Sequence, residues 1–371
     1  MTIPLVDLSI QHREIEAEVR EGIDAVMRSG AFILGPAVAE FESAYADFCE
    51  VPHCVGVASG TDALELALRA LEIGPGDEVV LPANTFIASA TAVIRIGAQP
   101  VLVDCEADYH LIDLNQTAER IGSRTRAIMA VDLFGQAAPL VQLEDLAREA
   151  GVALIEDAAQ SHGARHGGRA AGSFGDVAGT SFYPAKNLGA YGDAGAVLTH
   201  SALLADRVRQ LRNYGSDVKY HHPLPGWNSR LDTVQAVVLL AKLRRLAAWN
   251  VQRRAAAALY DALLAELPDV VRPMTRGDNE HVWHLYVVRV SERDRVLASL
   301  NEAGIGAGIH YPTPIHLQGA FAGLGHGKGD FPIAEQAAAE MISLPLYPGI
   351  SEAQQGEVVA ALAAALSATR G

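Results

Sequence analysis

Seven short apolar runs recur along the first two-thirds of the chain, and amphipathic helical patterns separate several of them. The runs are CVGVASG (54–60), EVVLPAN (78–84), QPVLVDC (99–105), RAIMAVDLFG (126–135), VALIEDAAQ (152–160), VAGTSFYPAK (177–186) and AGAVLTH (194–200). Such near-continuous runs are typical of strands buried on both faces, and their alternation with helices predicts a mostly parallel sheet. The expected fold class is therefore α/β, in which ligands bind at the carboxyl ends of the strands.

The pattern changes after a long helical segment at residues 229–267. The stretch HVWHLYVVRV (281–290) alternates like a strand of an antiparallel sheet, and residues 296–314 predict a helix, a glycine turn and a second strand. A chain of 371 residues is also long enough for two domains. We therefore expect a large α/β domain at residues 1–245, which includes an N-terminal helical segment, and a smaller α+β domain at residues 246–371.

Charge and composition exclude several classes of function. The net charge is −15 and no stripe rich in Lys and Arg occurs, so nucleic-acid binding is not expected, although a few local cations could hold an anionic small substrate. The longest apolar runs are too short and too rich in alanine to span a bilayer, and the N-terminus has no signal-peptide core. Cys49, Cys54 and Cys105 have unrelated spacings, which predicts buried thiols in a reducing cytoplasm and neither disulfides nor a metal site.

Lysine is scarce in this chain, which makes one lysine conspicuous. Of 29 basic residues, four are lysines and the other 25 are arginines. A lysine amine can lose its proton when desolvated and attack a carbonyl, whereas arginine stays protonated. Lys186 ends the apolar run 177–186 and precedes a glycine-rich turn, so it is a candidate for such chemistry. For Lys219, Lys242 and Lys328 the expectation is an ordinary surface position.

Other side chains suited to a cofactor follow the predicted strands. Gly60 and Thr61 open a helix after the first run, where free N–H groups suit a phosphate, although a simple helix cap explains Ser59 or Thr61 about as well. Phe86 follows the second run and could either stack on a planar ring or pack in the core. Glu156 and Asp157 end the fifth run, and because successive strand side chains point to opposite faces, only one of them can face a given pocket. A helix cap or a loop salt bridge is the alternative role for that carboxylate.

These residues together match what pyridoxal 5'-phosphate (PLP) requires. A lysine amine holds its aldehyde as a Schiff base, and a carboxylate keeps the pyridine nitrogen protonated so that the ring acts as an electron sink. An aromatic side chain can stack on the ring, and a helix N-terminus with hydroxyl groups can take the phosphate. A dinucleotide-binding dehydrogenase is not favoured, because no G-x-G-x-x-G opens a helix after the first run.

The motifs also resemble a known family. SGTDALELAL, ANTFIASA, EDAAQSHGA, SFYPAKNLGAYGDAGAV, GWNSRLDTVQAVVLLAKL and the opening IPLVDLSIQ are similar to those of the DegT/DnrJ/EryC1/StrS family of PLP-dependent sugar aminotransferases. The resemblance runs nearly end to end and implies the fold-type I, aspartate aminotransferase-like architecture, with a seven-stranded sheet in the large domain. Some relatives carry histidine in place of the lysine and are dehydratases, and Lys186 argues against that chemistry. Many relatives have glycine where this chain has Ala185.

The resemblance implies a role for each matching position. Lys186 would be the Schiff-base lysine and Asp157 the partner of the pyridine nitrogen. Gly60, Thr61 and Ser181 would bind the phosphate, Phe86 would stack on the ring, and Gln160 would contact its hydroxyl side. Asn228 would reach the phosphate of the neighbouring subunit, so that a homodimer would have two shared active sites. The candidate substrate contacts are Tyr183, Tyr214, Lys219, His310, Tyr311 and His316.

Within the family, the motifs are most like those of enzymes that aminate C3 of a nucleotide-linked 3-keto-6-deoxyhexose. The expected reaction moves an amino group from L-glutamate to such a sugar, with dTDP as the nucleotide. A 4-keto-sugar, 3-keto-sugar-acid or aminocyclitol transaminase would share the same site. A binding or regulatory homologue without activity is the alternative from another class, and intact Lys186 and Asp157 count against it.

Overall fold

The computed structural model describes residues 2–369 and has a central sheet of seven strands. Their order across the sheet is β1 (His53–Val57), β9 (Gly195–Thr199), β8 (Val177–Ser181), β5 (Ala153–Asp157), β4 (Thr125–Val131), β2 (Glu78–Pro82) and β3 (Gln99–Val103). The strands from β8 to β3 pair in parallel, whereas β9 runs antiparallel to both of its neighbours. Each strand overlaps one of the seven apolar runs, so the mostly parallel seven-stranded sheet is confirmed.

Helices cover both faces of this sheet. They are α2 (Pro36–Phe48), α3 (Gly60–Ala70), α4 (Ile87–Arg95), α5 (Leu114–Arg120), α6 (Leu140–Ala150) and α7 (Ala202–Leu211), with a short 3-10 turn at Leu133–Gly135. Apolar side chains of α3, α4 and α7 form one layer of core, which includes Val79 and Leu81 of β2. Val80 points to the other face, into the layer covered by α5 and α6. This alternation buries both faces and explains why the strands read as continuous apolar runs.

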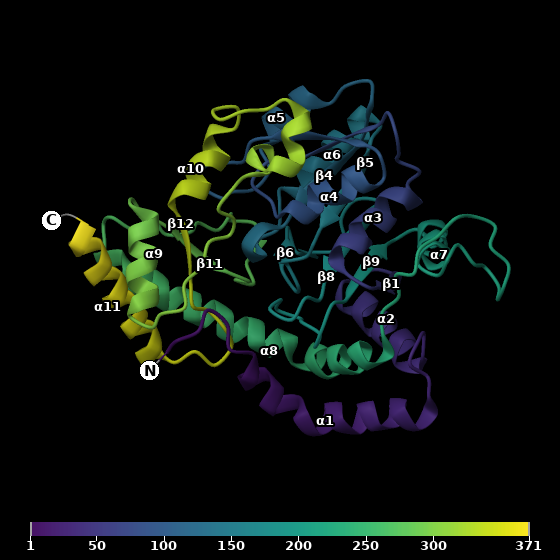
Figure 1. Cartoon of the computed structure of the whole chain (residues 1–371), viewed down its shortest axis with the longest axis horizontal. Helices are drawn as coiled ribbons and strands as arrows, with labels where there is room; N and C mark the ends of the chain where they lie inside the picture. The colour runs from purple at the N-terminus through teal and green to yellow at the C-terminus, as the bar shows by residue number, and fades with distance from the viewer. Residues whose placement is uncertain (1, 370–371) are drawn as a thin grey trace.

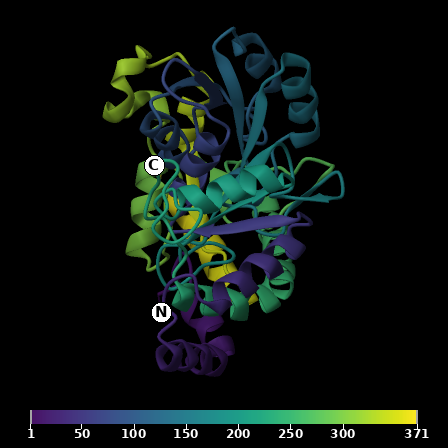
Figure 2. The same cartoon turned by 90° about the vertical axis from the view of Figure 1, so that its right-hand side faces the viewer.

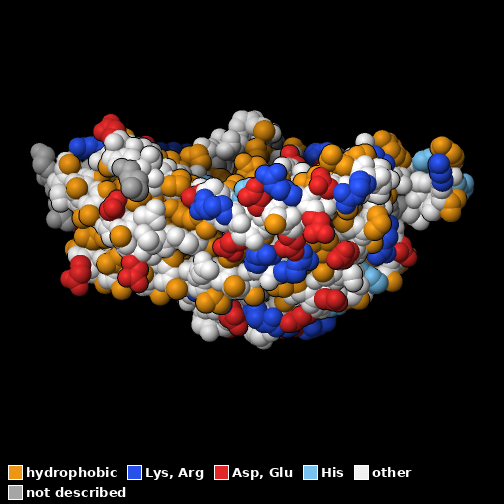
Figure 3. Space-filling model, turned by 90° about the horizontal axis from the view of Figure 1, so that it is seen from below, with side chains coloured by type: hydrophobic (Ala, Val, Ile, Leu, Met, Phe, Trp, Pro, Cys, Tyr) orange, Lys and Arg blue, Asp and Glu red, His pale blue; other side chains and the backbone are white. Residues whose placement is uncertain are grey.

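Helix α8 (Thr233–Leu263) is the longest element and runs beneath the sheet toward the C-terminal part of the chain, with α1 (Leu8–Ser29) lying below it (Figures 1 and 2). With the 3-10 turn Leu264–Glu266 it accounts for the helical segment expected at residues 229–267. Seen from the side of α1, acidic and basic side chains are interspersed across the surface (Figure 3). This face therefore has no single-sign stripe of the kind that binds a polyanion.

The C-terminal part builds a second, smaller core. Strands β11 (Tyr286–Arg289) and β12 (Met341–Leu344) pair antiparallel and pack with α9 (Arg293–Glu302) and α11 (Glu352–Thr369) against the last turns of α8. The remaining elements are α10 (Pro332–Glu340) and 3-10 turns at Ile315–Leu317 and Gly319–Leu324. Side chains from these turns and from α10 join the core of the large sheet. The division between residues 245 and 246 remains a prediction, and it falls inside α8.

One strand expected in the C-terminal part is confirmed only in part, and another was wrong. The strand expected at residues 281–290 is limited to β11, because residues 281–285 turn toward the large sheet. No second strand follows the glycine turn: Ile305 and Gly308 make only isolated bridges, to Ile3 and Ser343. Proline at positions 312 and 314 removes two backbone donors just beyond, so the segment cannot extend a ladder. The partner of β11 is instead β12, which the sequence pattern did not reveal.

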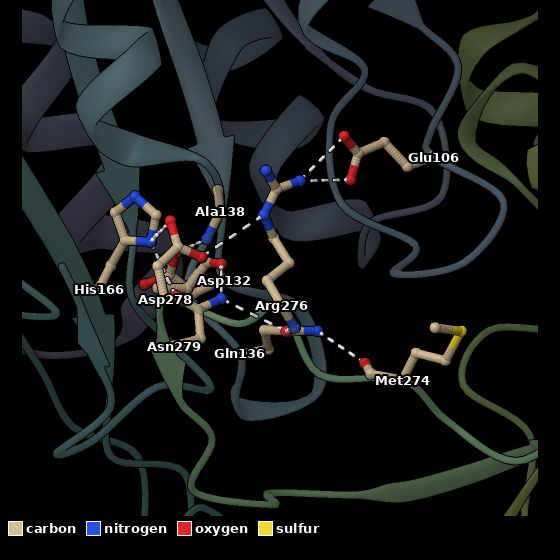
Figure 4. Close-up of polar contacts among 10 residues, drawn as sticks. Glu106, Asp132, Gln136, Ala138, His166, Met274, Arg276, Asp278 and Asn279 are labelled. Atoms are coloured by element: carbon tan, nitrogen blue, oxygen red, sulfur yellow. Dashed lines mark hydrogen bonds and ion pairs between the residues drawn. The ribbon is translucent and has the colours of Figure 1, made fainter.

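A polar network anchors the segment before β11 to the large sheet (Figure 4). Arg276 donates to both carboxylate oxygens of Glu106, at 3.0 and 2.9 Å. Gln136 accepts the Arg276 backbone N–H at 2.6 Å and donates to the carbonyl of Met274 at 3.2 Å. Just beyond, β10 (Asn279–Glu280) pairs with β6 (Arg165–His166), which in turn pairs with β7 (Arg169–Ala170). Residues 274–280 are thereby fixed to segments that follow β3, β4 and β5, although they lie far from these segments in sequence.

Lys242 is a correction to the sequence analysis. It was expected on the surface, but it is only 2% exposed on α8, because α1 and the turn after Lys186 cover that face of the helix. Its Nζ lies 5.1 Å from the ring centroid of Tyr191, and burial lowers its pKa to about 8. Lys219 and Lys328 are exposed, as expected.

The structure also bears on the expectations for the cysteines, for membrane-spanning helices and for metal-binding clusters. Cys49, Cys54 and Cys105 are free and buried, which confirms the expected buried thiols. Within residues 2–369, no helix combines the length and the apolar character that a membrane crossing needs. The same residues contain no cluster of three or more His, Cys, Asp or Glu side chains arranged to hold a metal ion.

Candidate active site

A cavity of about 420 Å³ lies at the carboxyl ends of β1, β2, β5 and β8. It is lined by ten of the residues predicted to bind cofactor or substrate: Gly60, Thr61, Phe86, Asp157, Gln160, Ser181, Tyr183, Lys186, His310 and Tyr311. These positions span about 250 residues of sequence, and the parallel topology brings them to one edge of the sheet.

Lys186 stands on a tight turn that follows β8. Its backbone N–H donates to the carbonyl of Tyr183 at 2.8 Å, and the turn folds back so closely that a Cβ on Gly189 would lie 2.2 Å from the carbonyl oxygen of Pro184. Only glycine fits there. Burial lowers the pKa of Lys186 to about 8, and the nearby Asp157 carboxylate opposes that shift. The neutral, nucleophilic form of the amine is therefore far more populated near neutral pH than it is for an ordinary lysine.

Asp157 is the carboxylate that faces the cavity. It ends β5, is 5% exposed, and accepts hydrogen bonds from the Ser89 hydroxyl at 2.7 Å and the Ala159 N–H at 3.2 Å. Burial raises its pKa, and these two donors and the Lys186 charge oppose the rise. A buried carboxylate beside a lysine suits a second cation, such as a protonated ring nitrogen.

Glu156 points to the opposite face of β5. Its two oxygens accept the backbone N–H groups of Gly172 at 2.6 Å and Phe174 at 3.0 Å, and the residue is fully buried. Burial is the largest cause of its strongly raised pKa, and the neighbouring Asp132 carboxylate adds to it. The expectation that only one of Glu156 and Asp157 can face the pocket is confirmed, and Glu156 supports the fold.

The N-terminus of α3 and the end of β8 form a cradle suited to a phosphate. A Cβ on Gly60 would lie 2.5 Å from the Cβ of Ser181, so only glycine lets the first turn of α3 approach the hydroxyl of Ser181 this closely. Ser59 caps α3 by accepting the N–H of Asp62 at 3.1 Å, which leaves the N–H groups of Gly60 and Thr61 at the helix start. Such N–H groups and the helix dipole favour an anion.

Aromatic and amide side chains form another part of the cavity lining. Phe86 is 48% exposed at the cavity, and its ring centroid lies 5.1 Å from that of Tyr311. Gln160 accepts the N–H of Phe134 at 2.6 Å and donates to the hydroxyl of Tyr311 at 3.1 Å. One face of the Phe86 ring is thereby available for a planar ligand.

Four predicted residues lie outside the cavity lining. His316 was expected to contact substrate, but it is buried beside Phe331 and bonded to Glu335 at 2.9 Å, so its role is structural. Tyr214, Lys219 and Asn228 lie in the segment between α7 and α8, which projects from the body of the molecule (Figure 1). Their predicted roles remain predictions, since Asn228 was assigned to the site of a neighbouring subunit.

The sequence analysis missed several cavity residues. Ser89, in the first turn of α4, hydrogen-bonds Asp157. The only available signal in the sequence was a hydroxyl residue three positions after Phe86. His284 lines the cavity although its stretch was interpreted as a regular strand. Leu5 and Val6 reach the cavity from the N-terminus, and no local pattern predicts such a return.

The residues present fit PLP. A lysine with a lowered pKa, a buried carboxylate that no arginine or lysine of residues 2–369 hydrogen-bonds, an exposed aromatic face and a glycine-dependent anion cradle meet in one cavity. Each corresponds to one chemical group of that cofactor: its aldehyde, its ring nitrogen, its ring face and its phosphate.

Comparison with known proteins agrees with this geometry. Residues 13–363 match the DegT/DnrJ/EryC1/StrS aminotransferase family. The chain is 46% identical to dTDP-3-amino-3,4,6-trideoxy-alpha-D-glucose transaminase of Streptomyces venezuelae over 360 residues, which is 97% of this chain and 95% of that protein. Its fold is similar to the crystal structure of S. venezuelae DesV in complex with a ketimine intermediate, with a TM-score of 0.95, 46% identity and 97% of each chain covered. It is also similar to NtdA of Bacillus subtilis with bound cofactor PMP, with a TM-score of 0.89, 30% identity, and 98% of this chain and 83% of that chain covered.

Proposed function

Because the chain belongs to the DegT/DnrJ/EryC1/StrS aminotransferase family, we propose that it moves the amino group of L-glutamate to C3 of a dTDP-linked 3-keto-6-deoxyhexose. It is a transaminase, and its cofactor is PLP. The observation that carries the proposal is the meeting of Lys186 and Asp157 across one cavity, beside the anion cradle at α3. The identity to a dTDP-sugar 3-transaminase supports the choice of sugar.

The cavity residues divide the tasks of cofactor binding. Lys186 would hold the aldehyde and Asp157 the ring nitrogen, while Gly60, Thr61 and Ser181 would hold the phosphate. When bound, the cofactor supplies an electron sink for the bonds at the reacting carbon. Phe86 would cover the ring, and Gln160, fixed by Phe134 and Tyr311, would meet its hydroxyl side.

The protein side chains supply the proton transfers. With its pKa near 8, Lys186 can take a proton from the substrate carbon through its lone pair and would then pass that proton to the cofactor carbon. Asp157 stays available as a charged partner because Ser89 and Ala159 hydrogen-bond its carboxylate. Phe86 and Tyr311 contribute neighbouring aromatic rings to the lining of the same cavity.

The nucleotide must extend out of the cavity, because about 420 Å³ holds a cofactor and a small substrate but not a whole nucleotide sugar as well. Tyr183, His310 and Tyr311 line the cavity and are placed to contact the hexose or the glutamate. Tyr214 and Lys219 lie on the projecting segment between α7 and α8, where they could contact the diphosphate.

We propose that the active unit is a homodimer with shared sites. Asn228 is exposed on the projecting segment and is not among the residues that line the cavity of its own chain, which suits a role in a second subunit. Mixing equal amounts of Lys186→Ala and Asn228→Ala chains is expected to restore about a quarter of the activity per chain, because about half of the dimers are then mixed and each mixed dimer contains one intact site. Turnover of the mixture equal to the sum of the two separate variants would contradict the shared site. The free buried cysteines agree with a cytoplasmic enzyme.

The substrate assignment is tested by product analysis. The enzyme with PLP is incubated with L-glutamate and either a 3-keto or a 4-keto dTDP-6-deoxyhexose, and NMR locates the new amine. We expect 2-oxoglutarate release and an amine at C3 with the 3-keto sugar. Amination at C4, or of a keto sugar acid or an aminocyclitol ketone only, would instead establish the corresponding alternative reaction.

A further inference from the structure

His284 is a buried imidazole at the cavity with no role assigned so far. It is 8% exposed, lies just before β11, and lines the same cavity as Lys186. Within residues 2–369 its Nδ1 has a hydrogen-bond partner and its Nε2 has none. A buried imidazole with one free nitrogen at a reactive lysine invites the question of which nitrogen carries the proton.

Two asparagine side chains determine the answer. Asn250 donates through Nδ2 to the carbonyl of His162 at 2.8 Å, which leaves its Oδ1 to accept from Nδ2 of Asn187 at 3.1 Å. Nδ2 of Asn187 also donates to the carbonyl of Val282 at 3.0 Å. A backbone carbonyl accepts only from an N–H, so both amides have one orientation. Oδ1 of Asn187 then faces Nδ1 of His284 at 3.2 Å, and that nitrogen must be the donor.

The imidazole is therefore neutral, and its Nε2 is a hydrogen-bond acceptor on a residue that lines the cavity. Burial holds the pKa of His284 well below its usual range, and the positive charge of Lys186 lowers it further. A neutral imidazole with its proton on Nδ1 has a lone pair on Nε2. His310 differs, because its Nδ1 partner is the hydroxyl of Ser343 at 2.8 Å, which can donate or accept and so leaves either tautomer allowed.

The backbone around His284 is held as firmly as its ring. Arg253, buried on α8, donates to the carbonyls of Trp283 at 3.1 Å, His284 at 3.4 Å and Leu346 at 3.2 Å. Trp283 adopts a left-handed conformation with φ 50°, which is unfavourable for a bulky residue and persists only where the surroundings impose it. This conformation directs the chain away from a regular strand and places the imidazole at the cavity.

The neighbouring segments hold both flanks of this site. Val282 donates its N–H to the carbonyl of Gly135 at 2.9 Å, and Leu285 donates to the carbonyl of Phe134 at 3.2 Å. Upstream, the network of Arg276 and Glu106 anchors the same segment (Figure 4). His284 is thus pre-organised by the large sheet, by α8 and by the residue that follows Lys186 in the chain.

We propose that Nε2 of His284 accepts a hydrogen bond from the Lys186 amine and so aims its lone pair at the substrate carbon during proton transfer. The inference rests on the proposed transaminase function. It makes His284 a positioning residue: the Lys186 nitrogen would take the proton from the substrate carbon and pass it to the cofactor carbon, and the imidazole gains and loses none. Asp157 is less suited to this task, since Ser89 and Ala159 already bind its oxygens.

Two substitutions separate the two nitrogens of the imidazole. In His284→Asn the amide nitrogen takes the place of Nδ1, so the contact with Asn187 is retained and the cavity acceptor is lost. In His284→Gln the amide reaches the position of Nε2, so an acceptor at the cavity is retained and the contact with Asn187 is lost. The matched pair therefore tests the acceptor and the support independently.

The first measurement is the reaction of PLP with the full-length protein freed of cofactor, followed by absorbance across pH. The neutral amine is the reactive form, so the rate of the wild-type protein should rise with pH around a midpoint of about 8. An acceptor stabilises the charged amine, so His284→Asn is expected to lower that midpoint by roughly 0.5 pH unit and His284→Gln to shift it less. An unchanged midpoint in His284→Asn would overturn the proposal.

The second measurement is a single turnover of the PLP-loaded protein with L-glutamate and with glutamate deuterated at Cα. His284→Asn is expected to slow this half-reaction about 10-fold and to increase the isotope effect, with His284→Gln within about threefold of the wild-type protein. A purely structural role would change thermal stability and leave the isotope effect unchanged, which would overturn the proposal. If the wild-type protein itself fails to react with glutamate, the proposed function fails and not only the role of His284.

A third readout needs no variant. In ¹⁵N NMR of the histidine-labelled wild-type protein at pH 7, His284 is expected to give the shifts of a neutral ring protonated on Nδ1. A ring protonated on Nε2, or a charged ring, would overturn the inference even if both variants failed to fold.

Discussion

Replacing Lys186 with alanine is expected to lower turnover by at least about 10³-fold, since one well-placed general acid–base group alone contributes about 10²–10⁴-fold. The same change should abolish the visible absorbance of the lysine-linked cofactor, because no other amine lines the cavity among the described residues. Both effects follow from one nitrogen, which binds the cofactor and moves the proton. Steady-state assays with L-glutamate and absorbance spectra of the purified protein measure them.

Lys242 offers a matched control. Like Lys186, it is a buried lysine whose pKa burial lowers to about 8, but it packs against Tyr191 outside the cavity lining. Lys242→Met should therefore keep the absorbance band and most of the turnover. Full activity of Lys186→Ala, or loss of the band in Lys242→Met alone, would mean that the wrong lysine has been identified.

Replacing Asp157 with asparagine is expected to lower turnover roughly 100-fold while the protein stays folded. Loss of a buried charged partner costs about 3 kcal/mol, which corresponds to a factor of about 100 in rate. Asparagine can still accept the Ala159 N–H through its Oδ1, and its Nδ2 can donate to the Ser89 hydroxyl, which is able to accept, so the local structure should survive. Turnover and urea unfolding, measured on the same preparation, separate the two effects.

Substitution of the adjacent Glu156 is expected to affect stability and not turnover. Both oxygens of Glu156 accept backbone N–H groups, from Gly172 and Phe174, and glutamine would turn an N–H toward one of them. Glu156→Gln should therefore lower the free energy of unfolding by about 1–3 kcal/mol and change turnover little. Equal activity of Asp157→Asn and wild type would remove the assigned role of Asp157, whatever Glu156→Gln shows.

The sheet was predictable because its strands are buried on both faces. Continuous apolar runs alternating with helices sufficed to place seven strands, and the rule that ligands bind at their carboxyl ends brought Lys186, Asp157, Gly60 and Phe86 together. These site residues were predictable from local sequence because each lies at, or shortly after, the end of a strand that the apolar pattern had already located.

Other parts of the site depend on tertiary contacts between residues that lie far apart in the sequence. His284 lies in a stretch that alternates like a strand, and only Arg253, the carbonyl of Gly135 and the strained Trp283 turn it toward the cavity. Likewise, no local pattern shows that α1 covers Lys242. His316 failed as a substrate contact because its distant partner Glu335 defines its surroundings. Tertiary contacts override a local pattern in each case.

Helix α8 contributes to the spacing between Lys186 and His284. Asn250 and Arg253 stand three residues apart on it, about 4.5 Å along the axis. The first bonds Asn187, the neighbour of Lys186, and the second bonds the backbone of His284. One helix thus fixes the positions of the Lys186 turn and of His284 relative to each other, although nearly 100 residues separate them in the chain. Motion of the outer segments to admit a bulky sugar would leave that spacing unchanged.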